Sequence, residues 1–178
     1  LEYVSNPQIS PDGDKVLYQR NFNDIMTDES LSNIWLIDYD GKNNRPITTG
    51  NYKDNSPKWS NQGDKFVFKS NREGKSQIFL FDLKNNSIQK LTNFQYSIES
   101  TQWSPDDNYI LFSSFIDSER DTLIEMPDKP KGAKWNDPPV EISDLNYRYD
   151  SSGYRKPGEV QFFTIPANGG TPRQISNI

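Results

Sequence analysis

A short pattern of turn residues recurs three times along the chain, and it constrains the fold more than any other feature. Each copy has a short segment ending in Ser, then a turn rich in Pro, Asp, Asn and Gly, then an apolar segment that begins six residues after the Ser. These anchor residues are Ser10, Ser60 and Ser104, so the repeat lengths are 50 and 44 residues. A repeat of this kind predicts several copies of one small structural unit.

The turn in the first copy shows why the pattern predicts a hairpin. It reads Ser10-Pro11-Asp12-Gly13. Proline presets its φ angle for a turn, aspartate bonds to the backbone two residues later, and glycine accepts a positive φ. The apolar segments on either side then become two antiparallel strands.

A second half-repeat follows each copy of the first. It consists of an apolar strand, a turn containing Asp, Asn or Gly, and a shorter strand. The spacing between the two strands is 13 residues in all three copies, from Ile34 to Ile47, from Ile78 to Leu91 and from Phe162 to Ile175. Each repeat therefore predicts four antiparallel strands.

Units of four strands and about 45 residues are typical of β-propeller blades. We predict an all-β fold, a partial β-propeller of about three four-stranded antiparallel blades, forming one domain over residues 1–178. The predicted blades are residues 1–50, 51–94 and 95–178. A β-sandwich with evenly spaced hairpins is the alternative, but it would not repeat the same turn residues at the same place. The composition, 32% hydrophobic and 13% aromatic, suits half-buried strands rather than disorder.

The blades differ in the connection between their second and third strands. The distance from the anchor Ser to the third strand is 18 residues in the second copy, 24 in the first and 58 in the third. The first copy therefore has about six extra residues near Asn23 to Ser30, and the third has about 40, roughly residues 116–157. Pro138 and Pro139 within the long insertion disfavour a helix or a central strand there.

The long insertion holds the candidate contact residues of the chain. Aromatic and cationic side chains gather near its end and could bind a peptide or a neighbouring domain. They are Tyr147, Arg148, Tyr149, Tyr154 and Arg155. Insertions in repeat proteins often occupy the binding face. The alternative is a surface loop that packs its own aromatics on the blade.

The repeat resembles the TolB-type propeller repeat. The resemblance rests on the Ser-Pro-Asp-Gly turn with its apolar strand and on the segment from Ser70 to Asp82, and it covers nearly all of residues 1–178. Such repeats occur in free-standing periplasmic interaction propellers and in the N-terminal propellers of prolyl-oligopeptidase-class serine peptidases. The insertion in the third copy is similar to the third-blade insertion of the acylaminoacyl peptidases. The chain as a whole resembles the acylaminoacyl peptidases and the dipeptidyl peptidases.

This resemblance implies a non-catalytic propeller segment that gates and positions peptide substrates for a separate α/β-hydrolase domain. The implied partners are further blades, that hydrolase domain and a peptide substrate. A free-standing propeller that acts as a protein-interaction scaffold is the alternative. A propeller lyase or glycosidase is a third possibility, but such enzymes use His or clustered acids in the central channel.

Catalytic chemistry is missing from the sequence itself. The chain has no histidine, no cysteine and no Gly-x-Ser-x-Gly segment, so a Ser-His-Asp triad cannot be assembled from it. We predict no catalytic residue, no metal and no cofactor. Asp38 and Asp40 resemble a fragment of a calcium loop, but the pattern lacks the further ligands and indicates a turn. Asp24, Asp28 and Glu29 indicate a solvated loop rather than a glycosidase pair.

The formal net charge of the chain and the open faces of the predicted blades indicate which partners the chain can have. The formal net charge is −5, and no basic patch indicates nucleic acid or an anionic membrane as a partner. The longest apolar runs are about four or five residues, against the roughly 20 that span a bilayer. Three blades leave two blade faces open, which predicts that the isolated chain self-associates. The sequence is compatible with either the cytoplasm or the periplasm as the location of the protein.

Overall fold

The computed structural model describes residues 2–118, 127–136, 142, 145, 147–150 and 153–176. By its internal contacts the chain forms two compact units. The first comprises Leu1–Phe115 and Val160–Ile178, and the second comprises Ile116–Glu159. Pro138 and Pro139, on which the prediction of irregular chain rests, lie outside the described residues.

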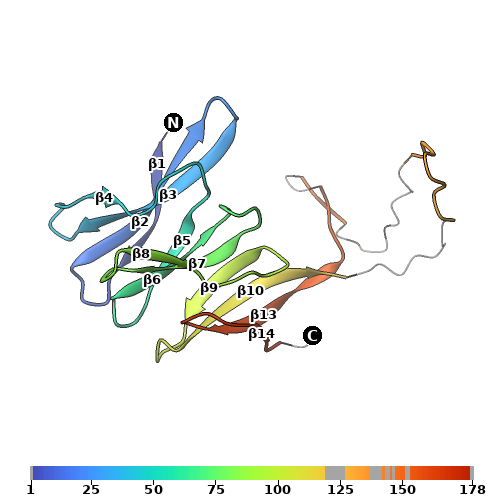
Figure 1. Cartoon of the computed structure of the whole chain (residues 1–178). Coiled ribbons are helices and arrows are strands. Elements are labelled where there is room, and N and C mark those ends of the chain that lie inside the picture. The colour runs from blue at the N-terminus through green and yellow to red at the C-terminus, as the bar shows by residue number, and fades with distance from the viewer. Residues whose placement is uncertain are drawn as a thin grey trace. The chain divides into compact units, whose positions relative to one another are not determined.

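The first unit is built from three separate four-stranded antiparallel sheets (Figure 1). In blade 1 and blade 2 the strands pair in chain order, and in blade 3 they do so around the long insertion. Blade 1 contains β1 (Tyr3–Ile9), β2 (Lys15–Asp24), β3 (Glu29–Asp38) and β4 (Arg45–Pro46); blade 2 contains β5 (Asn55–Trp59), β6 (Lys65–Ser70), β7 (Gln77–Asp82) and β8 (Ser87–Lys90); blade 3 contains β9 (Ile98–Trp103), β10 (Tyr109–Asp117), β13 (Gly158–Pro166) and β14 (Arg173–Gln174). The predicted all-β partial propeller is confirmed.

The anchor serines close the inner hairpin of every blade. The hydroxyl oxygen of Ser10 accepts a hydrogen bond of 2.9 Å from the N–H of Lys15, and that of Ser104 accepts one of 2.9 Å from the N–H of Tyr109. Ser60 does the same with Lys65 at 3.2 Å. The backbone N–H of each anchor donates in return across the turn. The repeated Ser is therefore needed because it replaces a ladder bond that the turn interrupts.

The outer hairpins use a second repeated hydroxyl. Strands β4, β8 and β14 are short, with two, four and two residues. Just beyond each of them a hydroxyl accepts a bond from the N–H of the third strand. The pairs are Ile34 with Thr48 at 2.9 Å, Ile78 with Thr92 at 2.9 Å, and Phe162 with Ser176 at 2.7 Å. A side chain thus continues the pairing where the backbone turns away.

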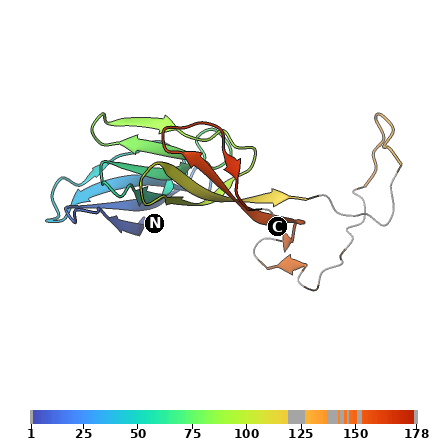
Figure 2. The same ribbon diagram turned by 90° about the horizontal axis from the view of Figure 1, so that it is seen from below.

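The core lies between neighbouring blades. Strand residues alternate between the two faces of a sheet, so each blade presents one apolar row to the previous blade and one to the next. Between blade 1 and blade 2 the buried cluster is Leu17, Ile34, Leu36, Phe66, Phe68, Phe79 and Phe81. Phe94, which follows β8, packs edge-on against Phe112 and Phe163 of blade 3, and these two rings stack on each other with centroids 5.3 Å apart. Figure 2 shows the three sheets from below.

In both blades that have one, the insertion lies in the connection between the second and third strands. In blade 1 the extra residues lengthen a regular hairpin, in which β2 and β3 pair from Lys15–Asp38 out to Asp24–Glu29. In blade 3 they form the second unit, which contains the two-stranded sheet of β11 (Arg148–Tyr149) and β12 (Gly153–Tyr154). Over the described part of the chain, no helix has the length and apolar character needed to cross a membrane.

Candidate functional site

The aromatic and cationic residues chosen from the sequence lie on one small hairpin of the second unit. In this hairpin Arg148 pairs with Tyr154, and Tyr149 pairs with Gly153. The φ angle of Gly153 is 76°, a region that residues with a Cβ rarely adopt, so glycine at this position allows the chain to reverse. The side chain of Tyr149 lies outside the described residues.

Two of the tyrosines form an exposed aromatic pair. The rings of Tyr147 and Tyr154 stack with centroids 6.4 Å apart and planes inclined by 28°. Tyr147 is 46% exposed and Tyr154 54% exposed. The backbone N–H of Arg155 donates to the carbonyl of Tyr147 at 2.8 Å, which holds the ends of the hairpin together. Arg148 and Arg155 are exposed beside this pair.

This arrangement can bind a peptide or a protein surface. Exposed tyrosine rings bury much area with little loss of side-chain freedom, and arginine donates hydrogen bonds to carboxylates and carbonyls. We call Tyr147, Arg148, Tyr149, Tyr154 and Arg155 the Tyr/Arg hairpin. The structure places all five residues on one hairpin; their role in binding stays a prediction.

The acidic residues of the first insertion form a turn. The carboxylate of Asp24 accepts bonds from the N–H of Met26 at 2.9 Å and from the hydroxyl of Thr27 at 3.1 Å. Asp28 has a positive φ of 55°, which Asp tolerates better than most residues. Asp24 and Glu29 face each other as the last strand pair before the tip.

The segment with the calcium-like spacing is also a turn. Asp38 accepts a bond of 2.6 Å from the side-chain amide of Asn43, and Asp40 accepts bonds from the N–H of Lys42 at 3.0 Å and from its ammonium group at 2.7 Å. These carboxylates are therefore occupied by their own loop. Among the residues that the structure describes, no group of three or more acidic side chains is arranged to hold a metal ion.

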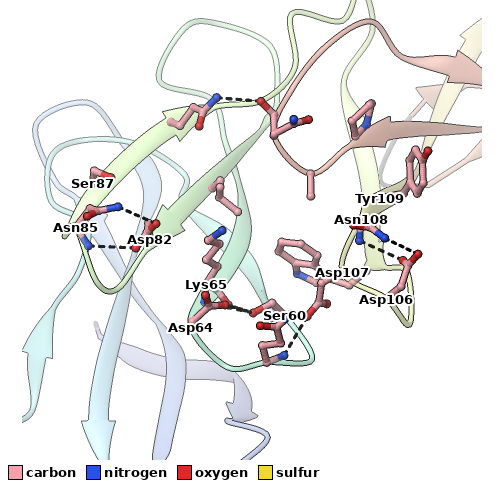
Figure 3. Close-up of a pocket in the computed structure, with 17 residues that line it drawn as sticks. Ser60, Asp64, Lys65, Asp82, Asn85, Ser87, Asp106, Asp107, Asn108 and Tyr109 are labelled. Carbon is pink, nitrogen blue, oxygen red and sulfur yellow. Dashed lines mark hydrogen bonds between the residues drawn. The ribbon is translucent and has the colours of Figure 1, made fainter.

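A polar cavity of about 660 Å³ lies between blade 2 and blade 3 (Figure 3). Four carboxylates line it; three accept hydrogen bonds within their own turn, and Asp107 accepts them from a turn of the other blade. Asp82 accepts from Asn85, Asp106 from Asn108, Asp107 from Asn61 and Gln62, and Asp64 from Ser60. The hydrogen bonds that Asp107 accepts come from the turn of blade 2, so they join the two blades at the edge of this cavity.

Asp106 shows how strongly these turns hold their carboxylates. Hydrogen bonds from the Ser104 hydroxyl and from the side chain and backbone of Asn108 lower the pKa of Asp106 from 3.8 to about 2. Asp12 occupies the same place in blade 1, and the hydroxyl of Ser10 and the N–H of Asp14 lower its pKa too. Both groups stabilise turns, because the bonds favour the ionised form.

Two sets of contacts were not predicted from the sequence, one between neighbouring blades and one within blade 2. Nε1 of Trp59 donates to the carbonyl of Gln8, and Nε1 of Trp103 donates to the carbonyl of Lys58. Asp54, fully buried, pairs with Arg72. The tryptophans could have been found, because both stand immediately before an anchor serine.

The comparisons with known proteins agree with the fold. A family model described as the TolB beta propeller domain matches residues 2–130. Dipeptidyl-peptidase 5 of Porphyromonas gingivalis is 36% identical over 149 residues, which is 84% of this chain and 21% of that protein. An uncharacterized peptidase of Bacillus subtilis, YuxL, is 26% identical over 175 residues, which is 98% of this chain and 26% of that protein.

Among solved structures, the acylaminoacyl peptidase of Pyrococcus horikoshii superposes with a TM-score of 0.71 at 20% identity. The match covers 98% of this chain and 25% of that protein. At this identity the likeness supports the fold alone. The chain spans about a quarter of the length of each of these relatives.

Proposed function

Because this chain belongs to the TolB β-propeller domain family, we propose that it is the non-catalytic propeller segment of a serine oligopeptidase or exopeptidase. In this role it gates and positions peptide substrates for a separate α/β-hydrolase domain. The blades form a rigid scaffold, and the insertion of blade 3 contacts the substrate or the hydrolase domain. A protein-interaction scaffold is the competing function.

One observation carries this proposal, namely that the similarity to proteins named as peptidases extends along almost the whole chain. The alignment with YuxL spans 98% of the chain, so it includes most of the long insertion as well as the repeats. A likeness limited to the repeats would fit any propeller of this family. Similarity that extends through the insertion favours the peptidase context.

The Tyr/Arg hairpin is the part of the chain that we assign to substrate or domain contact. Its paired rings and exposed arginines offer stacking surface and positive charge on a chain whose formal net charge is −5. A peptide with a free carboxylate, or an acidic surface of a hydrolase domain, matches this chemistry.

The first test asks whether the protein that carries this chain is a serine hydrolase. We expect a fluorophosphonate probe to label the polypeptide that contains residues 1–178, because the proposal requires a serine nucleophile on it. The isolated chain 1–178 should remain unlabelled, since it has no histidine to activate a serine. An unlabelled carrier protein would exclude the peptidase role and favour the scaffold.

The second test concerns the Tyr/Arg hairpin in that carrier protein. Tyr154→Ala and Arg148→Ala should raise KM for short peptides several-fold with little change in kcat, since they remove binding and not chemistry. Tyr39→Ala is the matched control, because Tyr39 is 82% exposed on a turn of blade 1. Unchanged KM in both hairpin variants would assign the hairpin to packing alone.

A further inference from the structure

One repeated position differs between the junction of blades 1 and 2 and the junction of blades 2 and 3. In blade 2 this position is Lys69, whose ammonium group donates a hydrogen bond across the junction to the carbonyl of Glu99. In blade 1 the matching residue, 50 positions earlier, is Gln19. Its side chain bonds to Asn6 and Asn21 of its own blade, and in the described structure none of its hydrogen bonds reaches blade 2. The junction of blades 1 and 2 therefore lacks this link.

A cavity of about 360 Å³ lies at this junction, and we call it the amide cavity. Its lining comes from β1, β2, β3 and the first residues of blade 2, and it consists mainly of amide and hydroxyl side chains. The amides are those of Asn6, Gln19, Asn21, Asn23 and Asn55. None of the described residues that line it is Asp or Glu, and Lys53 is the cation among them. On a chain with a formal net charge of −5, the amide cavity is therefore suited to a ligand that carries negative charge.

Three of these amides form a series of hydrogen bonds that runs in one direction. Nδ2 of Asn6 donates to Oε1 of Gln19 at 2.8 Å, and Nε2 of Gln19 donates to Oδ1 of Asn21 at 2.6 Å. Nδ2 of Asn21 then donates to the hydroxyl of Ser5 at 2.9 Å. Gln19 is 9% exposed and Asn21 is 8% exposed, so both amides are desolvated and depend on these partners. The series fixes the side chain of Asn6, which is its exposed end.

The backbone of β1 bulges where Asn6 stands. The strand register shifts between Ser5 and Gln8, and the φ angle of Asn6 is 51°. Blade 2 has the same irregularity at Ser56, whose φ angle is 53°. A bulge changes the direction in which a side chain leaves its strand. Here it accompanies the contact of Asn6 with Gln19, and Oδ1 of Asn6 is left without a hydrogen bond to any described residue.

The groups that remain free in the amide cavity match the chemistry of a peptide. A carboxamide donates and accepts at once, as a peptide unit does, so Asn6 can pair with both the N–H and the C=O of a peptide main chain. Nδ2 of Asn23 and the ammonium group of Lys53 also make no hydrogen bond to a described residue. The ammonium group can bind a carboxylate, which no acidic side chain in the described lining would repel.

We propose that the amide cavity is a peptide-binding site, in which Asn6 pairs with the main chain of a short peptide and Lys53 binds its terminal carboxylate. Because both contacts are made to groups that every peptide has, the site accepts peptides of varied sequence. The choice of a peptide as ligand rests on the proposed peptidase function, whereas the site itself rests on the cavity and its amide series. It is distinct from the Tyr/Arg hairpin, which belongs to the second unit.

Two matched ligands test the site directly on the chain 1–178. They are tri-alanine and tri-alanine amide, which differ only in the terminal carboxylate. We expect tri-alanine to shift the side-chain NH₂ signals of Asn6 and Gln19 in nitrogen-15 spectra until they saturate. The amide should bind about two- to five-fold more weakly, as expected for the loss of one exposed ion pair. Acetate, which has the carboxylate but no peptide unit, should bind more weakly than either.

Two variants assign the contacts, with the Gln19 signal as the readout. Lys53→Met should lower the affinity for tri-alanine to that for the amide and leave the affinity for the amide unchanged. Asn6→Ser should weaken both ligands about five-fold, because it removes the partner of the main chain. Serine stands at the matching bulge in blade 2, as Ser56, so the fold should be kept. Lys42→Met is the matched control, because Lys42 lies outside the cavity on a turn of blade 1, with its side chain 78% exposed.

Three results would overturn the proposal. The first is the absence of a saturable shift with tri-alanine in the unmodified chain, a measurement that depends on no variant. The second is equal weakening of both ligands by Lys53→Met, and the third is acetate binding as tightly as tri-alanine, which would indicate an anion site only. A carrier protein that the fluorophosphonate probe leaves unlabelled would exclude the peptidase role without changing any of these measurements.

Discussion

At the scale of single residues, the ion pair of Asp54 and Arg72 holds a fully buried carboxylate. Nη2 of Arg72 lies 3.0 and 2.9 Å from the two carboxylate oxygens of Asp54, which is 0% exposed. The guanidinium also lies over the rings of Phe68 and Phe79. Because Arg72→Met leaves a buried carboxylate uncompensated, we expect a loss of about 3–5 kcal/mol in the free energy of unfolding by urea denaturation.

Two further variants separate the charge from the packing. Adding Asp54→Asn to Arg72→Met should recover much of the loss, because the uncompensated charge disappears. Lys42→Ala is the control for an exposed ion pair: Lys42 and Asp40 lie 2.7 Å apart with side chains 78% and 52% exposed, so the change should stay below about 1 kcal/mol. If Arg72→Met cost no more than Lys42→Ala, the pair would have no structural role.

The carboxylate of Asp106 gives the fold a pH dependence with a definite sign. Its pKa is lowered from 3.8 to about 2 by the bonds from Ser104 and Asn108. The stabilisation is therefore complete above the unfolded value of 3.8 and is lost as pH falls through about 2. We expect Asp106→Asn to flatten the fall in the urea midpoint across this window. A carbon-13 NMR titration in which Asp106 protonates near its ordinary value would contradict this prediction.

At the scale of strands, the outer edge of each blade depends on a hydroxyl. Thr92 is 1% exposed, and its Oγ1 accepts from the N–H of Ile78 and donates to Gln77 at 2.8 Å. Thr92→Val keeps the shape but leaves the buried N–H of Ile78 without its partner. We expect a loss of about 1–3 kcal/mol in the free energy of unfolding.

The matched control is the same hydroxyl in blade 3. Ser176 accepts from the N–H of Phe162, but Phe162 is 42% exposed, so water can replace the lost bond. Ser176→Ala should therefore cost less than about 1 kcal/mol. Thr92→Ser should restore most of the stability lost in Thr92→Val. Equal costs for the Thr92 and Ser176 variants would mean that burial does not set the strength of this bond.

The strands could be predicted from the sequence because each is fixed by local chemistry. Ser10, Asp12 and Gly13 determine their hairpin within six residues, and the constant spacing of 13 determines the outer hairpin. Contacts between residues far apart in the chain could not be found in this way. Arg72 meets Asp54 across 18 residues, and Trp103 meets Lys58 across 45, so no local pattern indicates either pair. The same holds for the Tyr/Arg hairpin, where the residues could be chosen but the stacking of Tyr147 on Tyr154 could not.

At the scale of the whole molecule, the exposed faces of the first and the last blade differ. Blade 1 presents Ile9, 70% exposed, and blade 3 presents Phe162, 42% exposed. An interface that joins unlike surfaces is heterologous, and it produces rings or open chains rather than closed pairs. Association of the isolated chain through these two surfaces would therefore be head to tail.

We expect the isolated chain to self-associate head to tail in sedimentation velocity runs at rising concentration. The association should be weak, because Ile9 cannot donate the hydrogen bond that Trp59 and Trp103 donate between blades. Ile9→Trp should supply the missing indole and shift association to lower concentration, whereas Ile9→Asp should abolish it by placing a charge on the apolar face. Monomeric behaviour of all three proteins at high concentration would show that open blade faces do not drive association. Equal association of all three would place the contact elsewhere on the molecule.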